Sequence, residues 1–219
     1  MSMKFGTVAI VGRSNVGKST LLNRLLREKI AIVSEKPQTT RTRILGIVHA
    51  PGAQIALLDT PGIHKPEHLL NRRMIRTTVE TLEAADVLLI LMDATSLPGP
   101  GDLLALDHVN AAIRKHARPV ILVLNKIDLV NKIKLLPVIE TYAKLHSWTE
   151  TVPVSAQTGD NVDRLLDVMV GHLPEGDAAY GKDTITDQSM RTLAAEMIRE
   201  KLLRQTYNEV PYSIAVEIE

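Results

Sequence analysis

Eight consecutive residues near the N-terminus carry the most specific chemistry in the sequence. The pattern G-x-x-x-x-G-K-[ST] is met by Gly12-Arg13-Ser14-Asn15-Val16-Gly17-Lys18-Ser19. In such a loop the glycines allow a tight turn that points backbone N–H groups at phosphate oxygens. The lysine reaches the β- and γ-phosphates, and the hydroxyl after it binds Mg²⁺. Together with Thr20, these residues are the predicted phosphate-binding set for a nucleoside triphosphate.

The sequence on both sides of this loop fits the motif. An apolar run at 7–11 precedes it and is typical of a buried parallel strand, and leucines at helical spacing follow it within 18–28. A helix that begins at the loop adds the partial positive charge of its N-terminus to the site. This context favours a phosphate site over an ordinary glycine-rich turn.

A second motif, Asn125-Lys126-Ile127-Asp128, selects the base. It follows the apolar run 120–124, which should place it at the same edge of the sheet as the phosphate loop. The carboxylate of Asp128 can accept the N1–H and 2-amino hydrogens of guanine, whereas adenine has no donors on that edge. A buried acceptor left unpaired costs about 1–3 kcal/mol, so GTP rather than ATP is the predicted ligand. Asn125 would bridge loop segments and the base, and the stem of Lys126 would cover the ring.

Two further segments complete the predicted site. The first is Asp59-Thr60-Pro61-Gly62, which follows the apolar run 55–58. Here Asp59 would hold Mg²⁺ through water, and the Gly62 N–H would contact the γ-phosphate. The second is Val154-Ser155-Ala156, in which the backbone amides of Ser155 and Ala156 are expected to face the guanine O6.

Strand-like and helix-like segments alternate between residues 7 and 172, which predicts a doubly wound α/β fold with a mostly parallel sheet. Strands are predicted at 7–11, 44–50, 54–58, 86–92, 119–124 and 151–154. Helices are predicted at 18–28, 67–83, 102–116, 132–146 and 161–172. Only Pro51-Gly52 separates 44–50 from 54–58, so these two strands should form an antiparallel hairpin.

Composition limits the class of protein. The chain has 219 residues, of which 45% are hydrophobic and 3% aromatic, so Leu, Ile, Val and Ala must build its core. The absence of cysteine excludes disulfides and thiolate metal sites and favours a reducing compartment. With a net charge of +1, no signal peptide and no long apolar run, a cytoplasmic protein is expected. Peripheral contact with the inner face of the cell membrane stays open.

The C-terminal part differs from the rest. Residues 173–188 have little periodicity and are predicted to form a linker. Ser189 is expected to cap a helix that runs to about Gln205 and is followed by a strand at 212–218. One face of this helix is predicted to be apolar, formed by Leu193, Met197, Ile198, Leu202 and Leu203. A helix and one strand make no core of their own, so this segment either docks on the first domain or opens a second one.

The motifs over 7–172 resemble the translation-factor-related class of GTPases. Within that class the chain resembles the bacterial Era family in four segments: Lys36-Pro37-Gln38-Thr39-Thr40-Arg41, Asp59-Thr60-Pro61-Gly62-Ile63-His64, Ile198-Arg199-Glu200-Lys201-Leu202 and Glu209-Val210-Pro211-Tyr212-Ser213. The resemblance implies a GTPase domain at 1–172, a linker at 173–188 and an incomplete α+β KH-type segment at 189–219. It also implies GTP hydrolysis to GDP with Mg²⁺, and a role in assembling the small (30S) ribosomal subunit by binding its ribosomal RNA. A monomer is expected.

KH domains clamp RNA with a G-x-x-G loop, and none lies beyond residue 182. From Asp183 onward the sequence has seven acidic and four basic residues, which is no electrostatic footprint for RNA. RNA binding is therefore expected to need further C-terminal residues. Two rival functions stay open: the GTPase domain of a related tRNA-modifying or ribosome-binding protein, and a GTP-dependent binding module with negligible turnover.

The resemblance also assigns catalytic roles, to Asn15, Lys18 and Thr40. Thr40 is carried over as the switch threonine that meets Mg²⁺ and the γ-phosphate, with Thr39 as its rival, in a loop (30–43) expected to move with nucleotide state. Ile63 stands where many small GTPases have the glutamine that orients water. His64 beside it is expected to be an ordinary loop histidine without a catalytic role. Asn15 matches a position that, in potassium-activated relatives, helps to hold K⁺ beside the phosphates.

Overall fold

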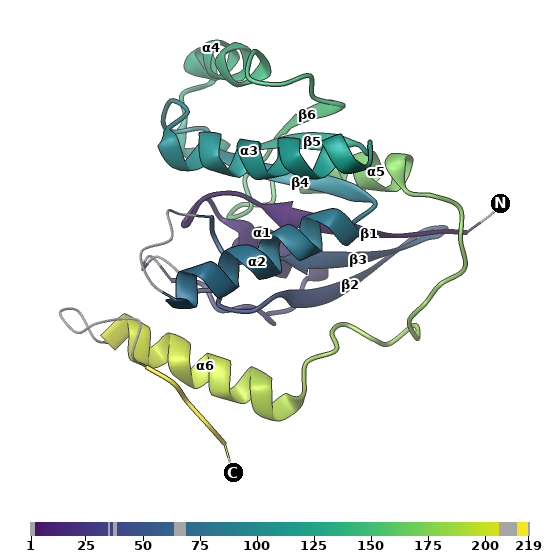
Figure 1. Ribbon diagram of the computed structural model, residues 1–219, viewed down its shortest axis with the longest axis vertical. Helices are drawn as coiled ribbons and strands as arrows, with labels where there is room; N and C mark the ends of the chain where they lie inside the picture. The colour runs from purple at the N-terminus through teal and green to yellow at the C-terminus, as the bar shows by residue number, and fades with distance from the viewer. Residues whose placement is uncertain (1–2, 35, 37–38, 64–68, 206–213, 219) are drawn as a thin grey trace.

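A six-stranded sheet organises the chain (Figure 1). The computed structural model describes residues 3–34, 36, 39–63, 69–205 and 214–218. The sheet order is β2-β3-β1-β4-β5-β6. The predicted hairpin is confirmed, since β2 is antiparallel to β3, and every other pair is parallel. The strands are β1 (Lys4–Val11), β2 (Ile44–Ala50), β3 (Ala53–Asp59), β4 (Val87–Asp93), β5 (Val120–Asn125) and β6 (Glu150–Pro153).

The helices lie where the leucine spacing predicts them, with shifted ends. They are α1 (Lys18–Leu26), α2 (Leu69–Ala84), α3 (Pro100–Lys115), α4 (Lys132–Ala143), α5 (Val162–His172) and α6 (Met190–Gln205), with a 3₁₀ turn η1 (Ile127–Leu129). Helix α1 ends before the predicted residue 28 because Arg27 takes the left-handed conformation, φ 56°. Helix α3 begins early because Pro100 suits the first turn and the Asp102 carboxylate accepts the Gly99 N–H at 3.0 Å. The predicted start of α2, at 67, lies outside the described residues.

Helices cover both faces of the sheet. The α1 and α5 side chains pack with one set of strand residues, and the α2, α3 and α4 side chains pack with the other. Strand β4, in the middle, is buried along its whole length and consists of aliphatic residues up to Asp93. Strands buried on both faces are near-continuous apolar runs, so the core needs few aromatic residues.

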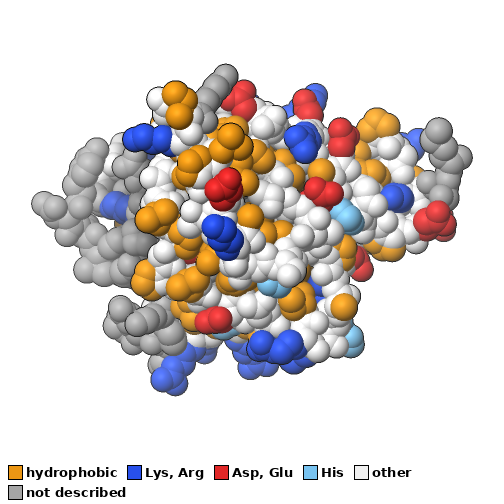
Figure 2. Space-filling view, turned by 90° about the horizontal axis from the view of Figure 1, so that it is seen from above, with side chains coloured by type: hydrophobic (Ala, Val, Ile, Leu, Met, Phe, Trp, Pro, Cys, Tyr) orange, Lys and Arg blue, Asp and Glu red, His pale blue; other side chains and the backbone are white. Residues whose placement is uncertain are grey.

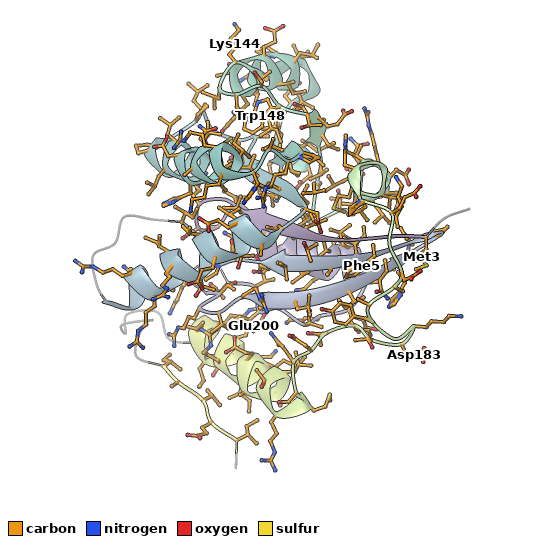
Figure 3. All side chains as sticks on the ribbon, turned by 45° about the vertical axis from the view of Figure 1, so that its right-hand side comes forward. Met3, Phe5, Lys144, Trp148, Asp183 and Glu200 are labelled. Carbon is orange, nitrogen blue, oxygen red and sulfur yellow. The ribbon has the colours of Figure 1, made fainter. Side chains whose placement is uncertain are left out.

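The linker 173–188 runs alongside β2 toward α6 (Figure 1). The N–H of Ile47 donates to the Ile185 carbonyl at 2.7 Å, and the Thr186 hydroxyl donates to the Leu45 carbonyl, also at 2.7 Å. Farther back, the Tyr180 ring packs at 6.2 Å from the ring of Phe5, which Figure 3 labels near the end of the sheet. The linker has no helix or strand, as predicted, but it is bound to the sheet along its length.

Helix α6 differs from its prediction in the face that it buries. The predicted cap is confirmed, because the Ser189 hydroxyl accepts the Thr192 N–H at 3.1 Å. The predicted apolar residues differ in burial: Leu203 is 2% exposed, whereas Met197, Ile198 and Leu202 are 44%, 46% and 37% exposed. The residues of α6 that are buried are Arg199, Glu200 and Leu203. Leu193 packs against the core cluster of the sheet, and the buried charged side chains contact the backbone and side chains of the loop that follows α1.

The strand predicted at 212–218 is not formed in its described part. Residues 214–218 make no strand pairing, and 212 and 213 lie outside the described residues. A strand needs a partner for its backbone hydrogen bonds, and the described sheet does not include this segment. The Ile214 carbonyl accepts instead from Arg41 Nη1, at 3.0 Å.

Figure 2 looks down on the side of the molecule where α4 lies, and hydrophobic side chains are visible there among charged ones. In and before α4, Leu129, Ile133 and Leu136 are 70%, 84% and 69% exposed. Among the described residues, no helix has the length and apolar character needed to cross a membrane.

Candidate nucleotide-binding site

The predicted motifs meet at one edge of the sheet, where the parallel strands end. The phosphate loop after β1 and the Asp59–Gly62 segment after β3 are joined directly, because the Ile63 N–H donates to the Gly12 carbonyl at 3.1 Å. A side chain at Gly62 would place its Cβ 2.7 Å from the Ser14 hydroxyl oxygen. Only glycine therefore allows this segment to lie against the phosphate loop.

Three oxygens predicted to serve Mg²⁺ lie together. The Ser19 hydroxyl donates to Asp59 Oδ2 at 2.7 Å and lies 2.9 Å from the Thr40 hydroxyl. Asp59 Oδ1 is buried without a hydrogen-bond partner among the described residues. Burial raises the pKa of Asp59 from 3.8 to about 6, although Lys18, the Ser19 and Thr40 hydroxyls and a backbone N–H oppose the shift. This oxygen set suits a hard divalent cation, so the residues fit Mg²⁺.

Lys18 lies across its own loop. Its Nζ donates to the carbonyls of Arg13 and Gly12 at 2.9 and 3.2 Å, and the residue is only 6% exposed. Burial lowers its pKa to about 8, Asp59 opposes the shift, and Arg13 adds to it. Phosphate oxygens bound in this loop would bring negative charge close to the Lys18 ammonium group and favour its charged form.

Asn125 ties the phosphate loop to the base-recognition loops. Its Nδ2 donates to the Val16 carbonyl at 2.7 Å, and its Oδ1 accepts the Ala156 N–H at 2.9 Å, in a residue that is 2% exposed. The predicted bridge between loop segments is therefore formed. The expectation that the Ser155 and Ala156 amides face the guanine O6 stays a prediction. In the structure the Ser155 N–H donates to the Asp160 carbonyl at 3.0 Å and the Ala156 N–H to Asn125, so both amides help to hold this loop.

The side chains of Lys126 and Asp128 lie in different environments. Lys126 has left-handed backbone, φ 68°, and its Nζ donates to Asp93 Oδ2 at 2.6 Å. Arg13 reaches the same carboxylate oxygen at 3.4 Å. Although burial opposes it, hydrogen bonds from Lys126 and Thr95 hold the pKa of Asp93 below its usual value. Asp128 is exposed, within η1, where a bound base could approach it.

The chain is similar to known GTPases over nearly its whole length. A family model described as "50S ribosome-binding GTPase" matches residues 7–126. GTPase Era of Syntrophus aciditrophicus is 48% identical over 216 residues, which are 99% of this chain and 69% of that protein. GTPase Era of Heliobacterium modesticaldum is 46% identical over 217 residues, 99% of this chain and 71% of that protein. The chain belongs to the Era family of GTPases.

Solved Era structures agree with this. A crystal structure of Era in complex with MgGDPNP and nucleotides 1506–1542 of 16S ribosomal RNA matches with a TM-score of 0.92 and 46% identity, over 99% of this chain and 72% of that one. An Aquifex aeolicus Era variant bound to GDP and aluminium fluoride also gives 0.92 and 46%, over 99% and 73%. A bacterial selenocysteine-specific elongation factor, at 21% identity and a TM-score of 0.63, shows only the shared fold.

Of the remaining predicted site residues in this Era-family chain, some line a cavity and others hold the neighbouring backbone in place. Asn15 (φ 63°) and Thr20 line a cavity of about 810 Å³ that extends toward Lys126. Thr60 is fully buried, and its hydroxyl donates to the Ile10 carbonyl at 2.8 Å. The carbonyl of Pro61 accepts from a threonine hydroxyl of α2 at 3.4 Å. Thr60 and Pro61 therefore hold the end of β3 in place.

Ile63, which stands at the expected glutamine position, is 1% exposed and packs in the core with α2 and α3 side chains. Its side chain is therefore part of the apolar core and offers no polar group to a water molecule. His64 lies outside the described residues.

Three supporting residues were missed in the sequence. Asp93 is the last residue of β4 and lies at the same edge of the sheet as the predicted motifs, so this position could have identified it as a site residue. Asn23 Oδ1 accepts the N–H groups of Ile30 and Ala31 at 3.1 and 2.9 Å, at the start of the 30–43 loop. Arg24 donates to the Ala156 carbonyl at 3.1 Å. Both lie on α1 at positions that look like solvent-facing polar residues, so no local signal distinguishes them.

Proposed function

We propose that this chain is a molecular switch that hydrolyses GTP to GDP and phosphate with Mg²⁺. The observation that carries the proposal is the position of Ser19 Oγ, 2.9 Å from the Thr40 hydroxyl and 2.7 Å from Asp59 Oδ2, beside the buried Lys18. That arrangement suits a phosphate chain and its divalent ion, and a glycine-rich loop surrounds it.

Each group at the phosphate end then has a role. Lys18 neutralises charge on the β- and γ-phosphates, and the loop amides and the Gly62 N–H orient their oxygens. Ser19, Thr40 and Asp59 hold Mg²⁺, which when bound offsets the negative charge that builds up on the phosphate oxygens. Thr40 is favoured over Thr39 because its hydroxyl is 2.9 Å from Ser19 Oγ, whereas the Thr39 hydroxyl donates to the Lys36 carbonyl at 2.8 Å.

At the base end, Asp128 accepts the guanine N1–H and 2-amino hydrogens. The Lys126 stem covers the ring, fixed by its bond to Asp93, and Asn125 keeps the two ends of the site in register. Ser155 and Ala156 support this pocket through the loop that they hold. These roles account for a preference for GTP over ATP.

Turnover is expected to be slow without help, because buried Ile63 cannot orient the attacking water. We assign the aid to Asn15, whose position in the phosphate loop suits a K⁺ ion beside the β- and γ-phosphates. A cation there would offset charge as an arginine finger does.

The biological role follows from the relatives. Because the similar Era structure binds nucleotides of 16S ribosomal RNA, we propose that this chain acts in 30S subunit assembly in the cytoplasm. We further propose a GTPase domain at 1–172, a linker at 173–188 and a KH-type segment at 189–219. The exposed apolar residues of α6 support this division, because they suit packing against the rest of a KH-type domain. Peripheral membrane contact is a secondary proposal, for which exposed Ile133 and Leu136 are the candidate residues.

The decisive experiment is multiple-turnover phosphate release from GTP and from ATP. We expect GTP turnover that Lys18→Ala and Ser19→Ala abolish, with ATP inactive at the same concentration. Tight GTP binding with no turnover above the Lys18→Ala background would instead favour a binding module.

RNA binding is tested separately, by comparing this chain with the same chain extended by the C-terminal part of a relative. Only the extended protein is expected to bind the 3′ region of 16S ribosomal RNA. Equal binding by both would refute our placement of RNA recognition.

A further inference from the structure

Helix α6 presents a buried arginine to the loop that carries the switch threonine. Arg199 is 3% exposed, although it lies on a surface helix, and its Nη2 donates to the backbone carbonyl of Thr39 at 2.7 Å. Glu196 accepts from the same guanidinium twice, at 2.9 Å from Nε and 2.5 Å from Nη2. This paired geometry fixes the plane of the guanidinium group and so aims it at the carbonyl.

The other neighbour of Thr40 is also tied to the C-terminal segment. Arg41 Nη1 donates to the Ile214 carbonyl at 3.0 Å. Thr39 and Arg41, one on each side of Thr40, are thus held by residues more than 150 positions away in the sequence. Between them the Thr40 hydroxyl lies 2.9 Å from Ser19 Oγ, within the oxygen set described above.

Helix α6 also contacts the beginning of this loop. Figure 3 labels Glu200 on the side of α6 that faces the sheet domain, and its carboxylate, 1% exposed, pairs with Lys29 Nζ at 2.6 Å. Arg204 pairs with Glu200 and donates to the Val33 carbonyl at 3.4 Å. One helix therefore contacts the loop at its start and again beside Thr40.

The chemistry of these contacts argues against simple surface docking. Removing a guanidinium from water is costly unless it is paired and hydrogen-bonded, and α6 leaves apolar Met197 and Ile198 exposed while burying Arg199 and Glu200. A backbone carbonyl is a fixed point on the loop, so a bond to it sets the position of the next residue.

We propose that Arg199 is a positioning residue for GTP hydrolysis, which holds the Thr39 carbonyl so that the Thr40 hydroxyl faces the metal and the γ-phosphate. The inference rests on the proposed role of Thr40. Because that threonine serves only the triphosphate state, loss of Arg199 weakens binding of Mg²⁺ with GTP and leaves GDP binding unchanged.

The test compares Arg199→Met and Arg199→Lys with Arg191→Met, an exposed arginine on the same helix. Affinities for GDP and for a non-hydrolysable GTP analogue are measured in Mg²⁺, together with the Mg²⁺ concentration that gives half-maximal turnover. For Arg199→Met we expect the analogue to bind about ten- to a hundredfold more weakly, as for loss of a charged hydrogen bond, with GDP affinity changed less than about twofold. Arg199→Lys should recover part of the loss, because an ammonium group can donate to the same carbonyl, and Arg191→Met should match wild type.

Equal weakening of both nucleotides by Arg199→Met, or no weakening of either, would overturn the inference. If Arg199→Met does not fold, Glu196→Gln replaces it; this variant loosens the guanidinium and should show the same split between the two nucleotides. Thr40→Ala separates the two proposals. If Thr40→Ala leaves analogue affinity intact, the role of Thr40 itself is wrong; if Thr40→Ala weakens it and Arg199→Met does not, only the role of Arg199 is wrong.

Discussion

Replacing Asp59 with asparagine should stabilise the protein without metal while removing its response to Mg²⁺. Asp59 is 0% exposed, and burial raises its pKa from 3.8 to about 6. The native state therefore binds a proton more tightly than the unfolded chain does, so stability rises as pH falls through 6 toward 3.8 and is lowest when the carboxylate is ionised. About two pKa units at 1.36 kcal/mol each make the ionised group cost about 3 kcal/mol near pH 7.5.

The asparagine side chain has nearly the same shape as the carboxylate and no charge, so Asp59→Asn removes this cost. Part of the gain is lost because Lys18 no longer has a carboxylate nearby to favour its charged form. We expect a net gain of about 1–3 kcal/mol in the free energy of unfolding. For a chain of 219 residues this corresponds to a Tm increase of roughly 3–9 °C.

The assay is thermal unfolding in EDTA at pH 7.5 and at pH 4.5, then in Mg²⁺ with a non-hydrolysable GTP analogue at pH 7.5. In EDTA the Tm difference should be large at pH 7.5 and shrink at pH 4.5, where native Asp59 is protonated. In Mg²⁺ with the analogue, wild type should gain more than the variant. A variant that is less stable than wild type in EDTA at pH 7.5 would refute the reasoning, because the buried charge would then be no burden.

Three further changes test other parts of the site. Gly17→Ala should abolish nucleotide binding in titration calorimetry, because Gly17 has φ +101° and a Cβ there would lie 2.2 Å from Asn125 Nδ2; retained affinity would show that the loop can rearrange. Asp93→Asn should speed GDP release about tenfold in a fluorescent-nucleotide chase, since it replaces the carboxylate that fixes Lys126 with a neutral amide, and an unchanged rate would remove Asp93 from the site. Wild type should release phosphate faster in KCl than in NaCl and Asn15→Ala should not, with GDP affinity preserved; equal wild-type rates in the two salts would contradict the role of Asn15.

The sequence predicted the sheet and the meeting of its loops because both depend on local signals. Aliphatic runs that end in polar motifs mark strands, and parallel strands bring those ends to one edge. The two-residue turn at Pro51-Gly52 allowed only a hairpin, and the structure has it. The sequence predicted that the Gly62 N–H contacts the γ-phosphate, and the structure places Gly62 against Ser14 of the phosphate loop.

The features that the sequence did not predict depend on contacts between residues far apart in the chain. The sequence predicted an apolar face on α6 and left open what that face contacts. The contacts of α6 to the backbone of Thr39 and to Lys29 depend on a loop far away in the sequence, and backbone carbonyls leave no pattern in the amino-acid types that bind them.

The linker 173–188 has a consequence for the solubility of shortened forms. Strand β2 is one of the two edge strands of the described sheet, and an edge strand can pair with another molecule through its unoccupied N–H and C=O groups. The Ile185 carbonyl takes up the Ile47 N–H, and Thr186 occupies the Leu45 carbonyl, so the connection to α6 also shields the sheet from intermolecular strand addition. A GTPase domain cut at residue 172 would keep its nucleotide motifs and expose this strand. Its tendency to aggregate would then come from the lost linker, in a protein whose catalytic residues are all intact.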